Sequence, residues 1–286
     1  MARSSARPWL GFVVLLALAL PGCGGEKSAQ AAGHKGELGA GRLVVTGSST
    51  VAPLLFEMAR RFEDLHPGAR IDVQTGGSSR GIADARSGAA DIGMVSRSLK
   101  GEEADLEAHA IARDGIAMIV HRDNSIGELT DEQVVSLFTG RITRWSQVGG
   151  ADEPVVVVNK AAGRATLEVF LHHFGIEEGT VKADVVIGDN QQGIKTVAGN
   201  PFAIGYVSIG TAITEAERGI AIRLLPSGGV APTLENVGQG RFPVVRTLSL
   251  VTRGEPSPLA RVFIAFCQSP DQHDLVGAQF FVPIAD

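Results

Sequence analysis

The sequence predicts an α/β fold of two α/β lobes with mixed, mostly parallel sheets. Short apolar runs, typical of buried strands, alternate with segments whose apolar residues recur at helical spacing. This alternation indicates parallel strands joined by crossover helices. The length of 286 residues is enough for two domains of ordinary size. Hydrophobic residues make up 44% and charged residues 20% of the chain, close to globular averages, which argues against wholesale disorder.

Residues 1–22 are predicted to be a secretion signal. Arg3 and Arg7 give a positive start, and residues 9–20 form an uncharged apolar run that is shorter than the about 20 residues of a membrane-spanning helix. The signal ends in Leu-Pro-Gly-Cys, which resembles the bacterial lipobox, so Cys23 is the predicted lipidation site. An ordinary signal peptide followed by a chance cysteine is the alternative.

Residues 23–41 are small and polar without periodicity, and we expect them to form a flexible tether to the folded body. The second cysteine, Cys267, lies in an apolar run and is expected to be buried and inert. The chain has 36 glycines, nearly twice the usual ~7 per cent, and their scatter indicates many tight loops.

The folded body is predicted to open with a strand at 43–45, ended by Gly47, and a helix over 50–65. This helix carries apolar residues at helical spacing, Ser48 or Ser49 can cap it, and a His-Pro-Gly sequence stops it. The same criteria place strands at 71–73, 91–95 and 116–120 and a short helix at 82–86.

A capping box opens the next predicted helix, because Thr130 and Gln133 stand three residues apart before a segment that reaches Phe138. Later apolar runs predict strands, and apolar residues at helical spacing predict helices. The strands are 155–158, 203–207 and 248–252, and the helices are 166–174 and 258–268.

Three loops, at 46–50, 75–81 and 159–166, each follow a strand and open a helix. Each places glycine, hydroxyl groups and backbone N–H groups at a helix N-terminus. There the first four N–H groups have no partner within the helix, and the helix dipole favours negative charge. If the three loops converge, they form a site for a tetrahedral oxyanion. The alternative is that each is no more than a capped helix, and the P-loop spacing does not occur.

Other classes of function find little support in the sequence. The net charge of −5 argues against a nucleic-acid binder, and two cysteines cannot build a disulfide framework or a cysteine zinc site. His172 and His173 are adjacent on a predicted helix and so lie on different faces, which argues against a metal site. No Gly-x-Ser-x-Gly elbow occurs, and no spacing supports a catalytic triad.

The body also contains motif segments that extend well beyond the three loops. They are TGSSTVAPL (46–54), GGSSRGI (76–82), DIGMVSRSL (91–99), ARDGIAMIVH (112–121), LFTGRITRWSQVGG (137–150), NKAAGRATLEVF (159–170) and NPFAIGYVSIG (200–210). With these segments in family order, the chain resembles the phosphate-binding lipoproteins of bacterial ABC import systems from about residue 42 to the C-terminus.

The resemblance implies a periplasmic-binding-protein type II fold, in which a two-strand hinge joins the lobes and the ligand lies in the cleft between them. Lobe I would comprise 42–119 and 246–286, and lobe II would comprise 120–245. The protein would pass inorganic phosphate to an ABC permease and ATPase complex and would not act as an enzyme. We expect a monomer without cofactor in the cell envelope, periplasmic or on the outer surface, held to the membrane by the lipid on Cys23 alone.

Carried over position by position, the resemblance gives a predicted set of phosphate ligands. Lobe I would supply Ser49, Thr50, Ser78 and Ser96, with Arg97 beside the last. Lobe II would supply the side chains of Lys160, Arg164 and Thr166 and the backbone N–H groups of Gly163, Arg164, Ala165 and Thr166. Asp91 is interpreted as a structural acid and not as a ligand.

The chain departs from the family pattern in two places, at Ser96 and within the motif at 160–166. Ser96 stands where family members have an aspartate that accepts the proton of hydrogen phosphate. Lys160 replaces an arginine, and Arg164 replaces a serine, in the usual Arg-x-x-Gly-Ser-Gly-Thr motif. A lysine lacks the planar fork of arginine, so we hypothesise that Arg164 takes over the bidentate contact with the oxyanion.

The departure at Ser96 keeps other ligands open, namely sulfate, molybdate or an organophosphate. A secreted phosphatase would need a nucleophile beside a base or a two-metal site, and the sequence offers neither arrangement. A surface sensor or adhesin lipoprotein is a third alternative, in which the loops would have no ligand.

Overall fold

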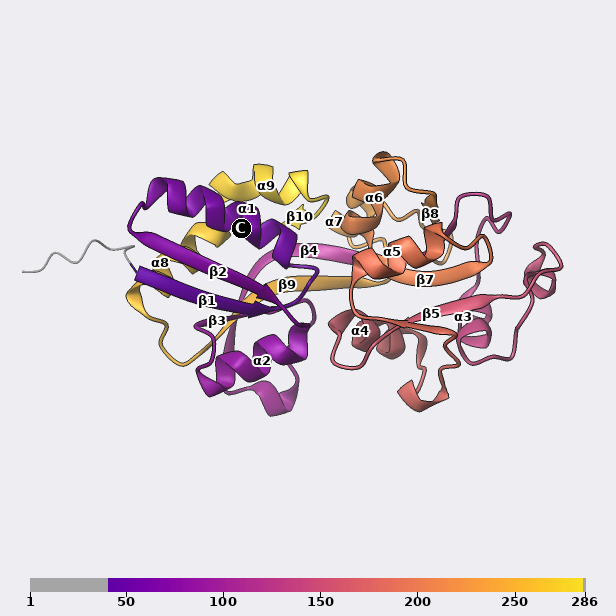
Figure 1. The fold of residues 1–286 in the computed structure, drawn as a ribbon, viewed down its shortest axis with the longest axis horizontal. Helices are drawn as coiled ribbons and strands as arrows, with labels where there is room; N and C mark the ends of the chain where they lie inside the picture. The colour runs from indigo at the N-terminus through magenta and orange to yellow at the C-terminus, as the bar shows by residue number, and fades with distance from the viewer. Residues whose placement is uncertain (1–40, 285–286) are drawn as a thin grey trace, which may run out of the picture. The chain divides into compact units, whose positions relative to one another are not determined.

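The computed structural model describes residues 41–284. The predicted signal, tether and Cys23 lie outside these residues. The first part of the body, residues 41–95, alternates strand and helix as predicted, and Figure 1 shows these elements at the N-terminal end of the described chain. They are β1 (Gly41–Gly47), α1 (Ala52–Leu65), β2 (Ala69–Thr75), α2 (Ser78–Ser87) and β3 (Ile92–Val95).

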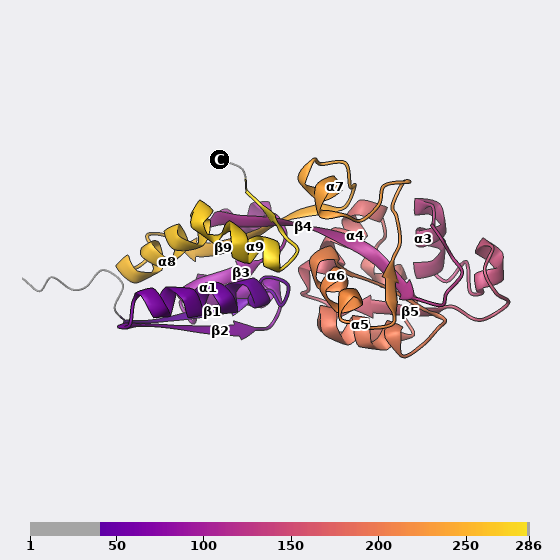
Figure 2. The same cartoon turned by 90° about the horizontal axis from the view of Figure 1, so that it is seen from above.

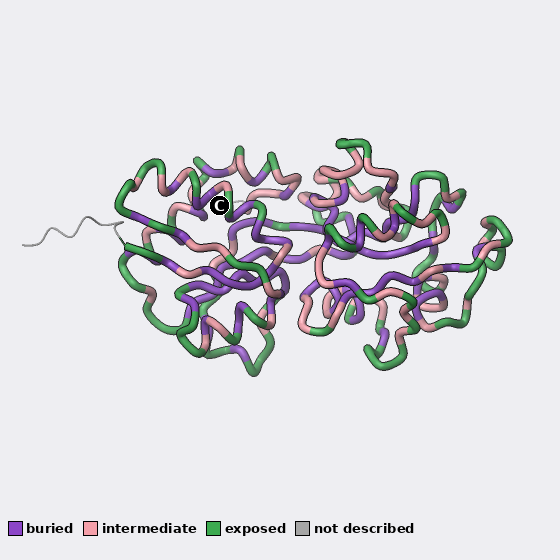
Figure 3. Tube along the Cα trace, in the orientation of Figure 1, coloured by how far each residue is buried: buried purple, intermediate pink, exposed green. Residues whose placement is uncertain are grey.

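Two long strands run side by side through the middle of the body (Figures 1 and 2). They are β4 (Leu106–His121) and β9 (Val245–Arg253). β4 pairs antiparallel with β9 over 106–115 and then with β7 over 116–120. Figure 3 shows both strands as largely buried. β4 therefore belongs to two bodies, and β9 accompanies it where it passes from one to the other.

The remaining elements follow β4 in the sequence. They are α3 (Asp131–Phe138), β5 (Val156–Lys160), α4 (Ala165–Phe174), β6 (Val185–Ile187), α5 (Asn190–Ala198), β7 (Ala203–Ser208), α6 (Ile209–Glu217), β8 (Ile222–Leu224), α7 (Leu234–Gly238), α8 (Pro258–Gln268), α9 (His273–Ala278) and β10 (Val282–Pro283). Short 3₁₀ helices lie at Gly101–Glu103, Trp145–Val148, Glu178–Thr180 and Pro270–Gln272.

The strands form a mixed sheet in the order β2-β1-β3-β9-β4-β7-β5-β6, with β8 and β10 both paired to β4. Pairs around β1 and β5 are parallel, as crossover helices require. The pairs that β9 makes with β3 and β4, and that β4 makes with β7, β8 and β10, are antiparallel. The crossing strands thus make the sheet mixed.

The buried apolar residues gather around separate cores. One core takes its members from 43–112 and again from 248–281, so both ends of the described chain build it. Two further cores draw on 116–244. We call the bodies around these cores lobe I and lobe II. The predicted lobe boundaries at 119/120 and 245/246 remain a prediction.

Local sequence signals explain several elements. Thr130 Oγ1 accepts the Gln133 N–H at 3.2 Å, and Gln133 Oε1 accepts the Thr130 N–H at 2.9 Å, so the predicted capping box opens α3. Cys267 is 2% exposed in the lobe I core, and burial raises the pKa of its thiol, so the expectation of a buried thiol is confirmed. Within residues 41–284, no helix is long and apolar enough to cross a membrane.

Some elements differ from their predicted bounds. The strand predicted at 116–120 begins ten residues earlier, at Leu106. The prediction missed this first part because polar residues such as Glu107 and Arg113 interrupt its apolar pattern. The helix predicted at 82–86 begins at Ser78, which places that serine in its first turn. The sequence analysis missed β6, α5, α6, β8, α7, α9 and β10. Each of these has nine residues or fewer and so carries little periodicity.

Candidate functional site

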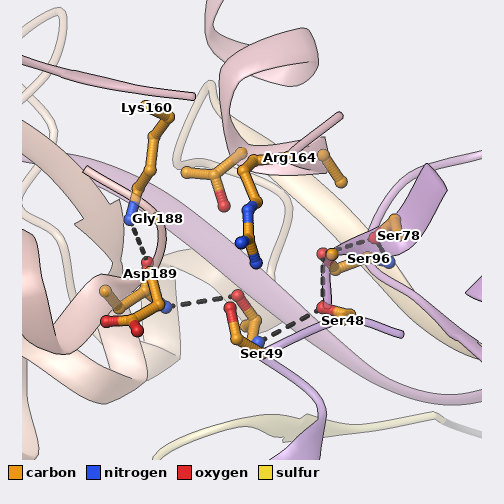
Figure 4. A pocket seen from close by; sticks show the side chains of 13 residues that line it. Ser48, Ser49, Ser78, Ser96, Lys160, Arg164, Gly188 and Asp189 are labelled. Atoms are coloured by element: carbon orange, nitrogen blue, oxygen red, sulfur yellow. Dashed lines mark hydrogen bonds between the residues drawn. The ribbon is translucent and has the colours of Figure 1, made fainter. Parts of the chain in front are cut away.

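One pocket collects residues from both lobes, and four of its segments lie at helix N-termini (Figure 4). Its lining residues are Ser48, Ser49, Thr50, Gly77, Ser78, Ser96, Lys160, Arg164, Ala165, Thr166, Gly188, Asp189 and Asn190. The cavity measures about 10 Å³, roughly the room of one water molecule. A larger ligand therefore requires the lobes or the Arg164 side chain to move aside.

The first loop leads from β1 to α1 and places Thr50 at the pocket. Ser48 Oγ accepts the N–H groups of Thr50 at 3.2 Å and Val51 at 3.4 Å and donates to Ser96 Oγ at 2.9 Å. Ser48 is thus occupied in shaping the loop. The N-cap residue of α1 is Val51, and no side chain caps this helix, so the predicted capping by Ser48 or Ser49 is wrong. Ser49 and Thr50, the two predicted ligands, remain at the pocket wall.

Glycines allow the second loop to approach the first. A Cβ atom on Gly81 of α2 would lie 2.8 Å from Thr46 O and 2.9 Å from Met94 O, so only glycine lets α2 pack this closely on β1 and β3. Ser78, in the first turn of α2, accepts the Ser96 N–H at 3.1 Å. This packing brings the predicted ligands Ser78 and Ser96 to the same wall as Thr50.

The third loop belongs to lobe II and opens α4. Arg164 is the N-cap residue, and Ala165 and Thr166 begin the helix, so their N–H groups lie at its positive end. These three residues line the pocket. Gly163 is outside the lining set and has a φ of 77°. Its carbonyl accepts the Ser79 N–H of lobe I at 3.4 Å.

Two cationic side chains reach the pocket from lobe II. Lys160 is 3% exposed, and its Nζ donates to Asn190 Oδ1 at 2.9 Å. Burial, together with the charges of Arg246 and Arg164, lowers the pKa of Lys160 to about 7, and the charge of Asp189 opposes this shift. Figure 4 shows Arg164 between Lys160 and the serines of lobe I, directed into the pocket.

Arg97, also predicted at the site, lies outside the pocket lining. Its guanidinium donates to both carboxylate oxygens of Glu103, at 2.7 and 2.8 Å, and its Nε lies 3.0 Å from Glu168 Oε2. The bonds from Arg97 lower the pKa of Glu103. Arg97 instead lines a neighbouring cavity with Lys100, Glu168 and other residues. Asp91 accepts the Val44 N–H at 2.8 Å, which fits its predicted structural role.

The sequence analysis missed a fourth loop, at the start of α5. Asp189 caps this helix by accepting the Gln192 N–H at 2.8 Å, and Asn190 donates to Thr50 Oγ1 across the pocket at 3.2 Å. The signal was a Gly-Asp-Asn sequence directly after the apolar run Val-Val-Ile. That run has only three residues, which is too short to stand out as a strand.

A buried ion pair, also missed, lies behind the pocket. Arg246 of β9 and Asp114 of β4 are register partners, and their side chains are 1% and 0% exposed. Arg246 Nε and Nη2 donate to Asp114 Oδ2 at 3.0 and 2.8 Å. Burial raises the pKa of Asp114, and the charge of Arg246 opposes that shift. An arginine inside the apolar run from Val244 to Val251 was the available signal.

The assembled site is suited to holding a small anion. It offers hydroxyl groups, helix N-termini and two cationic side chains, with the charge of Arg246 balanced by Asp114. Within residues 41–284, no group of three His, Cys, Asp or Glu side chains is close enough together to hold a metal ion.

Comparisons with known proteins agree with this geometry. A family model described as a PBP superfamily domain matches residues 26–271. The phosphate-binding protein PstS of Bacillus subtilis is 29% identical over 280 residues, which cover 96% of this chain and 91% of that protein. The PstS protein of Borreliella burgdorferi is 28% identical over 253 residues, which cover 84% of this chain and 89% of that protein.

Solved structures show the same likeness. A crystal structure from Clostridium perfringens, assigned as a phosphate ABC transporter substrate-binding protein with bound phosphate, is 33% identical with a TM-score of 0.80, and the match covers 86% of this chain and 100% of that one. An ABC-type phosphate transport receptor from Vibrio cholerae is 28% identical with a TM-score of 0.71, and the match covers 85% and 100%.

Proposed function

The chain belongs to the PBP superfamily, and from that premise we propose that it binds inorganic phosphate between its lobes and delivers it to an ABC permease. The observation that carries the proposal is the convergence of four helix N-termini, Lys160 and Arg164 on one pocket. Relatives named as phosphate-binding proteins match most of the chain, and they support phosphate as the ligand.

The proposed contacts divide between the lobes. Ser49, Thr50, Ser78 and Ser96 bind from lobe I, and Lys160, Arg164, Ala165 and Thr166 bind from lobe II. The two further predicted residues have supporting roles: Gly163 shapes the third loop against Ser79, and Arg97 holds the lobes together through Glu168.

We propose binding without chemical change of the ligand. Among the described residues that line the pocket, none is a histidine or a cysteine, so the hydroxyl groups there have no such base beside them. The relatives are named as binding proteins and transport receptors, which supports the same reading.

The cellular setting is part of the proposal. A signal at 1–22 directs export, lipid on Cys23 anchors the chain outside the cytoplasm, and the body acts as a monomer beside the permease and its ATPase. Lobe I at 42–119 and 246–286 and lobe II at 120–245 would close on the ligand by bending of β4 and β9.

A second candidate ligand has a specific observation in its favour. At Ser96 the pocket presents a hydroxyl group and not a carboxylate, so a fully ionised oxyanion such as sulfate meets no repelling charge there. Sulfate, molybdate and organophosphates are therefore included in the binding test. A sensor or adhesin lipoprotein would bind none of them.

Titration calorimetry of the mature chain tests the function. Arg164→Ala and Thr166→Ala should each weaken phosphate binding by at least ~1.5 kcal/mol, the scale of a charge-assisted hydrogen bond. Arg141→Ala removes an exposed arginine of lobe II away from the pocket and is the matched control. Tight binding of sulfate without heat from phosphate would contradict the proposed ligand, and unchanged affinity in both variants would contradict the site.

A further inference from the structure

We propose that Arg246 is a positioning residue that fixes three pocket hydroxyl groups and leaves two of them, on Thr50 and Ser96, able to contact an anion only as hydrogen-bond donors, and that these two positions consequently select fully ionised anion oxygens. The inference rests on the proposed function, because it concerns how the same pocket chooses among oxyanions. Arg246 itself lies outside the pocket lining, directly behind it.

The guanidinium of Arg246 reaches hydroxyl groups from both lobes. Its Nη2 donates to Thr50 Oγ1 at 3.2 Å, and its Nη1 donates to Thr166 Oγ1 at 2.9 Å and to Ser96 Oγ at 3.4 Å. All three hydroxyl groups belong to the pocket wall. One buried side chain therefore contacts three of the proposed ligand groups on the side away from the ligand.

These bonds decide which way the hydroxyl hydrogens can point. A hydroxyl group has two lone pairs and one hydrogen. Thr50 Oγ1 accepts from Arg246 and from Asn190 Nδ2 at 3.2 Å, and Ser96 Oγ accepts from Arg246 and from Ser48 Oγ at 2.9 Å. Both lone pairs are thus engaged in each case, and the group can add a further partner only by donating its hydrogen. For Ser96 the other hydroxyl group within reach is that of Ser78, at 3.5 Å, which also lines the pocket.

Because Asp114 balances the charge of Arg246, the effect of Arg246 on the hydroxyl groups depends on the orientation of its guanidinium more than on its charge. Asp114 takes the Nε side and one Nη of the guanidinium and is itself held by Ser208 Oγ at 2.9 Å. The pair fixes the planar fork with its remaining N–H groups directed at the hydroxyl oxygens. A lysine carries the same charge but has no planar fork, so it cannot hold all three oxygens in the same way.

The chemical consequence concerns the proton of the ligand. An O–H group on the anion needs an acceptor, and Thr50 and Ser96 offer none. Asp189 is the one carboxylate among the described lining residues, and one of its two oxygens, Oδ1, caps α5. At Thr50 and Ser96 the pocket wall therefore favours ionised oxygens, and sulfate, which carries no proton, should compete with hydrogen phosphate for these positions.

The test compares phosphate and sulfate affinities of Arg246→Lys with those of the wild-type chain by calorimetry, at a pH where phosphate retains one proton. Without the guanidinium, lone pairs of the hydroxyl groups become free to accept the O–H of hydrogen phosphate. Sulfate has no O–H group and gains no contact from this change. We expect sulfate affinity to fall roughly tenfold or more, phosphate affinity to fall less, and the phosphate-to-sulfate affinity ratio to rise at least about threefold.

A second variant avoids destabilising the protein through a single unpaired buried charge. Arg246→Gln combined with Asp114→Asn replaces the buried pair by two neutral amides, so neither charge is left buried alone. Arg253→Lys, an exposed arginine at the far end of β9, is the matched control and should leave the ratio unchanged. Thermal unfolding of each variant confirms that it is folded.

The possible results distinguish a failure of the inference about Arg246 from a failure of the proposed phosphate-binding function. Equal losses for both anions, or no loss, would show that Arg246 is a structural residue and would overturn the inference while phosphate binding by the wild-type chain stands. A wild-type chain that binds sulfate and rejects phosphate would overturn the proposed ligand but support a wall made of donors.

Discussion

At the scale of single residues, Lys160 links the site to pH. Burial and neighbouring cations hold its pKa at about 7, below the ordinary 10.5, and Asp189 opposes this shift. Between these pH values the unfolded chain binds more protons than the folded one, so the contribution of Lys160 to stability increases as the pH rises from about 7 to 10.5. A bound anion would raise the pKa of Lys160 again, because the negative charge of the anion favours the protonated lysine.

Anion binding should therefore take up a proton above pH 7. We expect the phosphate affinity of the wild-type chain to fall with rising pH more steeply than that of Lys160→Arg, which stays charged, by up to roughly tenfold per pH unit. Calorimetry from pH 6.5 to 8.5 measures both proteins, and titration of phosphate itself is common to them. A constant affinity ratio between the two would show that Lys160 does not titrate in this range.

The sequence predicted the hydroxyl and cationic residues of the pocket but not the partner that orients them. Ser49, Thr50 and Thr166 follow from loops that end strands and begin helices, which is a local signal. Arg246 lies 196 residues from Thr50, and no local pattern states that the two side chains meet. An arginine in an apolar strand signals a buried partner but does not say which one.

At the scale of elements, the pocket depends on how closely α2 packs against β1 and β3. The Cβ atom of an alanine at position 81 would lie within 3 Å of backbone atoms of Thr46, Gly47 and Met94, and backbone cannot turn aside as a side chain can. Such overpacking typically costs about 1–3 kcal/mol.

Gly81→Ala should lower the free energy of unfolding by this amount and also weaken phosphate binding, because α2 carries Ser78. Urea unfolding and calorimetry measure the two effects. Gly277→Ala in α9 is the matched control, since a Cβ atom there meets nothing within 4 Å and alanine favours helix. Wild-type stability in Gly81→Ala would mean that the close approach is not required.

Elements with a clear capping signal or apolar pattern were predictable, and several short ones without such a pattern were not. α1, α3 and α8 match their predicted positions to within two residues at each end because apolar residues at helical spacing, and in α3 a capping box, mark them. β6 and α5 were missed, and with them the fourth helix N-terminus of the pocket, because a strand of three residues has no alternation to detect. The pocket lining includes residues from all three recognised loops.

At the scale of the whole body, ionic contacts join the two lobes beside the pocket. Glu168 Oε2 of α4 lies 2.7 Å from Lys100 Nζ and 3.0 Å from Arg97 Nε of lobe I, and Ser79 Oγ donates to Glu168 Oε1 at 3.4 Å. Glu103 anchors Arg97 within lobe I. These contacts join the two lobes at residues outside the pocket lining.

Glu168→Gln should therefore speed phosphate release without changing the pocket. Lys100 is half exposed, so water weakens its ion pair with Glu168. We therefore expect the substitution to remove about 1 kcal/mol of attraction between the lobes, which corresponds to roughly fivefold faster phosphate release. Stopped-flow measurement of release tests this, and the difference should shrink at high salt. Glu177→Gln, an exposed acid just after α4, is the control. A release rate equal to that of the wild-type chain would exclude a role in closure.

The two-lobe architecture followed from strand and helix alternation together with length, but contacts between lobes did not. Arg97 follows Ser96 in the sequence, and the motif alone suggested a ligand. Its bidentate partner Glu103 is only six positions away, but its second partner, Glu168, is 71 positions further along the chain in a different lobe, so this contact between lobes becomes visible only once the chain is folded.

Asp114 and Arg246 face each other on the very strands that cross between the lobes. The ion pair behind the pocket thus lies on the two strands about which the proposed opening of the lobes would turn. Bending of β4 and β9 would then draw Thr50 and Thr166 away from the guanidinium that both contact, so that opening and loss of anion contacts would occur together. A substitution that stiffens these strands should consequently also alter anion affinity.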